Sequence, residues 1–87
     1  MKSQNELILE HLIKGYQLTP LGALKIFQCM RLGARIWDLE NGKLDGKFYI
    51  ISHEMVSKNK KKYSRYFMTK SQIELAKVLR GTHADTQ

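Results

Sequence analysis

Residues 18–41 read LTPLGALKIFQCMRLGARIWDLEN, and this stretch decides the fold. Thr19-Pro20 is a strong helix start, because a threonine hydroxyl caps free amides and a proline at the first helical position has no amide to leave unpaired. We expect this helix to run to about residue 27. It is expected to bury three apolar residues, Leu21, Leu24 and Phe27.

The second half of the stretch predicts another helix, over about residues 30–41, after a break at residues 28–30. Apolar residues recur at helical spacing on one face, at Leu32, Ile36 and Leu39. The opposite face carries Arg31, Ala34, Arg35 and Asp38. Two helices joined by about three residues have the geometry of a helix-turn-helix, in which the second helix enters the major groove of DNA.

One more helix is expected on each side of this pair, with a β-hairpin before the last one. Ser3 and Glu6 form a capping-box pattern that opens the first helix, and residues 16–18 after it can be extended. A strand is expected from residues 48–51 toward Val56, followed by a turn at 57–61 and a return strand over 62–68. Capping boxes at Thr69 and Ser71 predict a last helix through Arg80.

This order of elements predicts an α+β fold, a winged helix-turn-helix with a three-helix core, a β-hairpin wing and a C-terminal helix. A chain of 87 residues has room for one core, so residues 1–81 are expected to form a single domain. Residues 82–87 follow Gly81 and are expected to form a flexible tail.

Composition argues against several classes of protein. No apolar run approaches the roughly 20 residues that cross a bilayer, and the N-terminus lacks the pattern of a signal peptide. Cys29 is the single cysteine and is expected to be a small buried residue, so we expect a cytoplasmic protein without a disulfide. No catalytic constellation or cofactor motif is present, which predicts a protein that is not an enzyme. The three histidines are scattered, which argues against a zinc site: His11, His53 and His83.

Charge is concentrated in one part of the chain. Fifteen Lys and Arg against eight Asp and Glu give a net charge of +7, with a pI near 9.7. The segment from Lys47 to Lys70 holds seven of the cations and only one anion, Glu54. A basic patch on a small domain is typical of nucleic-acid binding, although an acidic protein partner would also fit.

The helix pair resembles the small winged-helix family that is common in bacteriophages and prophages. The similarity is carried by residues 18–24 and 27–39, and most specifically by the Arg-Leu-x-x-Arg-Ile core at residues 31–36. Residues 50–56 and 66–68 are similar to the wing strands of that family. The resemblance implies DNA binding. Our leading hypothesis is a double-stranded DNA-binding protein, encoded by a phage or prophage, that acts in the cytoplasm of a bacterial host in transcription regulation or recombination architecture.

The chain departs from this family in two places. Gln28 stands where the family usually has glycine, so a positive φ there would strain it. Residues 43–46 look like an insertion between the second helix of the pair and the wing, which affects the wing's angle.

Candidate DNA contacts lie on the second helix of the pair and on the wing. Arg31 and Arg35 could each donate two hydrogen bonds to guanine, or Arg35 could instead pair with Asp38. Gln28 and Asn41 could reach DNA at the two ends of the helix. Lysines suit phosphate contacts at the hairpin tip, or they form a solubilising turn. The remaining candidates are Thr19, Lys25, Lys58, Lys60, Lys61, Lys62 and Arg65.

Other interpretations stay open from the sequence. A phage-encoded inhibitor of a CRISPR effector or another host protein would fit the size and charge, and binding of double-stranded RNA is a third hypothesis. Trp37 is either half-covered by neighbouring elements or an exposed anchor for a partner. A homodimer is favoured slightly, because two-fold helix-turn-helix proteins read palindromes.

Overall fold

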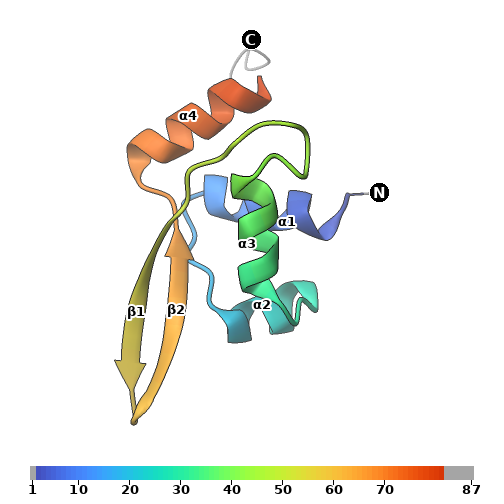
Figure 1. Cartoon of the computed structure of the whole chain (residues 1–87). Coiled ribbons are helices and arrows are strands. Elements are labelled where there is room, and N and C mark those ends of the chain that lie inside the picture. The colour runs from blue at the N-terminus through green and yellow to red at the C-terminus, as the bar shows by residue number, and fades with distance from the viewer. Residues whose placement is uncertain (1, 82–87) are drawn as a thin grey trace.

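The computed structural model describes residues 2–81 and contains the expected order of elements (Figure 1). Three helices come first: α1 (Gln4–Ile13), α2 (Pro20–Phe27) and α3 (Leu32–Glu40). A hairpin of β1 (Ser52–Lys58) and β2 (Lys61–Phe67) follows, and α4 (Lys70–Arg80) closes the described chain. The predicted winged helix, an α+β fold, is confirmed. The tail expected at residues 82–87 lies outside the described residues.

Three helices begin at the hydroxyl caps that the sequence indicates. The Oγ atoms of Ser3 and Thr19 accept hydrogen bonds from the amides of Glu6 and Gly22, at 3.2 and 3.0 Å. Thr69 and Gln72 form a complete capping box at the start of α4. Such caps are local in sequence, which is why these starts are predictable.

The core forms between α1, α3 and the segment that leads into the wing. α1 contributes Ile8, Leu9 and Leu12, which are fully buried. α3 contributes the predicted face, Leu32, Ile36 and Leu39. Around these pack Leu18, Ala23, Cys29, Tyr49, Ile51, Met68 and Ala76. Cys29 is a small buried residue, as expected.

The predicted buried face of α2 is wrong. Leu21 and Leu24 are 61% and 45% exposed, whereas Ala23 is buried and Phe27 packs partly against the core. The helix is therefore rotated so that Ala23 and Phe27, one turn apart, face inward. Small Ala23 lets α2 approach the core closely, and the two leucines remain at the surface.

The second helix of the pair is shorter than the predicted span of residues 30–41. α3 begins at Leu32 because its N-cap, Arg31, has φ −132° and ψ 66°, outside the helical region. It ends at Glu40, since Asn41 has left helical geometry as the C-cap. Met30 thus lies in the turn before α3.

The first strand of the hairpin begins later than expected, and the turn is tighter. Residues 48–51 do not belong to β1, which starts only at Ser52, opposite Phe67. Tyr49 instead donates its amide to the Leu39 carbonyl at 3.2 Å. The turn is just Asn59-Lys60, with φ of 52° and 66°, so both residues are left-handed as a type I′ turn requires.

A backbone bridge ties the wing to the start of α2. Leu18 and Tyr66 exchange two backbone hydrogen bonds, each 2.8 Å long, in an antiparallel bridge. The extended segment before Thr19 therefore lies along the base of β2. This bridge fixes the hairpin relative to the helix-turn-helix.

Candidate nucleic-acid interface

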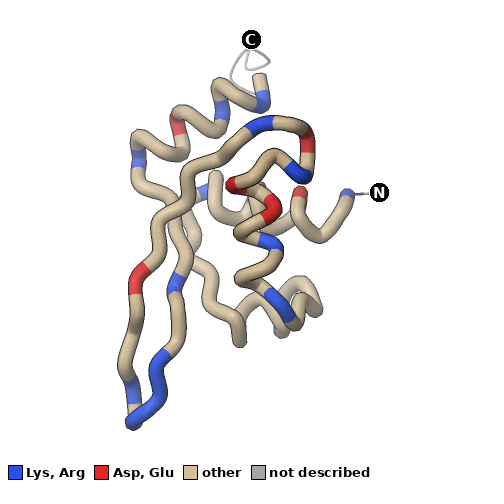
Figure 2. Tube along the Cα trace, viewed as in Figure 1, with Lys and Arg blue, Asp and Glu red and all other residues tan. Residues whose placement is uncertain are grey.

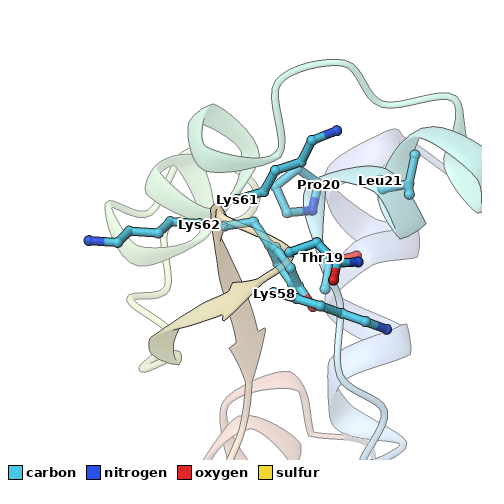
Figure 3. A pocket seen from close by; sticks show the side chains of 8 residues that line it. Thr19, Pro20, Leu21, Lys58, Lys61 and Lys62 are labelled. Carbon is cyan, nitrogen blue, oxygen red and sulfur yellow. The ribbon is translucent and has the colours of Figure 1, made fainter.

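A groove separates the start of α2 from the tip of the hairpin (Figure 3). Its volume is about 580 Å³. From α2 it is lined by Thr19, Pro20 and Leu21, and from the hairpin by Lys58, Asn59, Lys61, Lys62 and Tyr63. Figure 3 shows Lys58 and Lys61 extending toward the α2 side, while the end of Lys62 extends away from it. The structure thus brings together predicted residues that are about 40 positions apart in sequence.

The hairpin tip is the most concentrated cationic surface of the described chain (Figure 2). Lys58 and Lys61 face each other as the last pair of the ladder, with Lys62 beside them and Lys60 in the turn. All four lysines are exposed. Like charges on directly opposed residues repel, so this arrangement destabilises the isolated hairpin and favours binding of a polyanion.

Arg65 is set apart from these lysines by a partner of its own. It forms an ion pair with Glu54, the residue directly opposite on β1. The middle of the wing is therefore close to neutral, and the free positive charge is confined to the tip.

The two predicted arginines of the helix pair differ in their surroundings. Arg35 lies 3.0 Å from the carboxylate of Asp38, which also accepts a hydrogen bond from Asn5 of α1. The pairing that the sequence leaves as an alternative is thus present. Arg31 is exposed, and it gives α3 no side-chain cap. Of the two, Arg31 is the more available for a ligand.

The turn between α2 and α3 is held by backbone hydrogen bonds. Gln28 has φ 56° and ψ 34°, a left-handed conformation. Glycine, which similar proteins have at this position, adopts it without strain. The Gln28 amide donates to Leu24 at 3.0 Å, and the Cys29 amide donates to Ala23 at 3.1 Å. The bond from Gln28 to Leu24 is that of the αL C-cap motif, and the Gln28 side chain is exposed.

The remaining candidates flank this turn or the far end of α3. Lys25 is exposed in the last turn of α2. The Asn41 side chain donates to the Trp37 carbonyl at 2.8 Å, so it helps to end α3. Trp37 is 54% exposed, and the Lys43 ammonium lies 5.7 Å from its ring centroid. About half of Trp37 is therefore covered by the rest of the fold.

Sequence reasoning missed the apolar residues at this surface. Leu21 and Tyr63 line the groove, and Met30 is 86% exposed in the turn before α3. The exposure of Leu21 follows from the rotation of α2. That rotation is set by the packing of Ala23 against the core, which the number of leucines in the helix does not indicate.

Away from the groove, the pKa of Tyr49 is strongly raised. Burial, aided by Asp45, raises the pKa of Tyr49 from 10.0 to about 12. The Tyr49 hydroxyl donates to an Asp45 carboxylate oxygen at 2.7 Å. This hydrogen bond holds the loop of residues 43–46 against the segment that leads into the wing. Its role is therefore to stabilise the fold.

Two further features bear on the class of protein. Among residues 2–81, no group of three His, Cys, Asp or Glu side chains is placed to hold a metal ion. In the same part of the chain, no helix has the length and apolarity needed to cross a membrane.

Comparison with known proteins agrees with the fold. No curated protein and no solved structure matches the chain. A family model described as a winged helix-turn-helix domain matches residues 3–71, from the N-cap of α1 into the first turn of α4. The chain therefore belongs to the winged helix-turn-helix domain family, whose fold is a DNA-binding fold.

Proposed function

We propose that this chain binds double-stranded DNA, with the N-terminal end of α3 in the major groove and the hairpin tip on the sugar-phosphate backbone. The observation that carries the proposal is the groove that has Thr19 on its α2 side and three hairpin lysines on the other, Lys58, Lys61 and Lys62. It combines a helix N-terminus with exposed ammonium groups, and both favour phosphate oxygens.

The groove suits one strand of a duplex. Ammonium groups at Lys58 and Lys61 extend toward α2, so a phosphate between them and the start of α2 would meet positive potential from both sides (Figure 3). Such contacts supply affinity and register but do not select a sequence.

Sequence selection is assigned to the residues around the start of α3. Exposed Arg31 can form two hydrogen bonds to a guanine edge, and Gln28 can do the same with adenine. Lys25, exposed in the last turn of α2, would contact a neighbouring phosphate. Asp38 and Glu40 lie toward the other end of α3 and would be repelled by phosphates, so the helix would enter the groove by its N-terminal end.

The resemblance of residues 18–39 to phage and prophage helix-turn-helix proteins supports an origin in a phage or prophage. We place the chain among regulators of transcription or architectural proteins of recombination, encoded by a phage or prophage and acting in the host cytoplasm.

Selection of binding sites from a random duplex pool, at a low and a high salt concentration, tests the proposal. Enrichment of a common sequence is expected, and Arg31→Ala should lower the ratio of specific to non-specific affinity by about tenfold or more. Because that residue is exposed, the variant should fold normally. An inverted repeat in the enriched sites would indicate a two-fold dimer.

A complete lack of duplex binding at low salt would overturn the proposal. Capture of a host protein in a complex that survives nuclease treatment, together with that lack, would instead favour the protein-binding alternative. Stronger binding to a double-stranded RNA competitor would contradict the assignment to DNA.

A further inference from the structure

Met30 stands out among the apolar residues of the described chain, because 86% of it is exposed in the short turn before α3. Its neighbour Cys29 is buried and is tied by its amide to Ala23. The turn is therefore held in place, with one side chain inside the core and the next in solvent. Arg31 follows directly as the N-cap of α3.

We propose that Met30 is a specificity-determining residue that contacts the 5-methyl group of thymine in the major groove. The inference rests on the proposed function, in which the start of α3 enters that groove. Base edges there present hydrogen-bond donors and acceptors and a single apolar group, the thymine methyl. An exposed methionine at this position can stabilise the complex by covering that group and removing apolar surface from water.

Charge around Met30 favours DNA as its partner. Exposed Arg31 follows it, and Lys25 lies in the last turn of α2. The acidic residues of α3 lie toward its other end, and Asp38 is paired with Arg35. A polyanion drawn to these cations would bring its apolar groups onto Met30.

The side of α3 next to the wing carries little side-chain bulk, so a duplex can approach it closely. Gly33 is exposed and lies beside β2, since a Cβ built on it would be 3.7 Å from the Tyr66 hydroxyl. Glycine adds no side chain to this part of α3. The turn and the hairpin can therefore meet one duplex together.

Replacing thymine by uracil tests the inference, because it removes only the methyl group. The probe is the duplex enriched from the random pool, with each thymine replaced in turn. At one or two positions uracil should lower the affinity of the wild-type protein for the duplex by about fourfold. This is the change expected when one methyl-sized group is no longer buried. For Met30→Ala, uracil and thymine duplexes should bind with nearly the same affinity. Met30→Leu should keep most of the difference between them.

Val78→Ala is the matched control. Val78 is an apolar residue that is 56% exposed on α4, at the opposite end of the molecule from the α2–α3 turn (Figure 1). It should show the same uracil effect as the wild type.

Three results would overturn the inference. Uracil at every position could leave wild-type affinity unchanged, Met30→Ala could keep the full uracil effect, or the enriched site could lack A·T pairs. In each case duplex binding itself persists, so the proposed function survives. Absence of any duplex binding would remove the proposed function and this inference with it.

Discussion

Leu18 and Tyr66 are joined by a pair of 2.8 Å backbone hydrogen bonds, and this bridge sets the distance between the two halves of the candidate interface. Leu18 directly precedes Thr19, the cap of α2, and Tyr66 lies at the base of β2. The Tyr66 hydroxyl also lies beside Gly33 of α3. The start of α2, the wing and α3 thus meet around one tyrosine.

Neutralising lysines in the groove should weaken binding to all sequences alike. The double variant Lys58→Gln/Lys61→Gln removes two charges that extend toward α2. The slope of log K against log salt concentration should become shallower by about 1.8, because each lost phosphate contact contributes about 0.9. Fluorescence anisotropy over a salt series measures this slope.

The control for that variant is Lys14→Gln/Lys70→Gln, which removes two exposed lysines outside the groove. An equal change of slope in both double variants would show that only net charge matters and that the groove is not the binding site.

The free energy of unfolding should rise when Gln28 is replaced by glycine. Gln28 is left-handed at φ 56°, where a side chain costs free energy and glycine does not. We expect Gln28→Gly to stabilise the fold by about 1 kcal/mol in urea denaturation. Gln17→Gly, at an exposed residue without a positive φ, should not stabilise it. Destabilisation by Gln28→Gly would contradict the left-handed turn.

The rotation of α2 can be tested by truncating a leucine. Leu21 is 61% exposed, so Leu21→Ala should change the free energy of unfolding by less than about 0.5 kcal/mol. Leu12→Ala, at a fully buried leucine of α1, should cost about 2–5 kcal/mol. Comparable losses in the two variants would support the face that the sequence predicts and contradict the observed one.

Local signals explain what the sequence predicts well, and tertiary contacts explain the rest. Thr19 and Thr69 cap amides only three residues away, so the starts of α2 and α4 can be read directly. The buried face of α2 depends on which side meets the core, and two leucines suggested the wrong one. Residues 48–51 alternate exposed and buried as a strand would, yet the ladder begins only where Phe67 provides a partner.

The candidate site shows the same division. The basic segment, and even the pairing of Arg35 with Asp38, are visible as patterns along the chain. The groove is not, because it depends on the Leu18–Tyr66 bridge between residues 48 positions apart.

Alkaline pH should destabilise the fold through Tyr49. Below pH 10 the phenol is neutral in both the folded and the unfolded chain, so this tyrosine does not make stability depend on pH. Between pH 10 and about 12 the unfolded chain releases the proton while the folded chain retains it, because burial and Asp45 raise the pKa of Tyr49 to about 12. This should cost roughly 2–3 kcal/mol of stability over that interval.

Urea denaturation at pH values across this interval, with Tyr49→Phe for comparison, isolates the effect. The variant lacks the titrating hydroxyl, so its stability should fall less steeply above pH 10. Identical pH profiles for the two proteins would contradict the buried hydrogen bond to Asp45.

The salt dependence of duplex binding by the wild-type protein tests the central claim most directly. If the four lysines at the hairpin tip lie on phosphates, log K should fall with log salt concentration with a slope of about −3.6 or steeper. Binding that is absent at low salt, or that does not change with salt, would contradict a DNA-binding role for this surface.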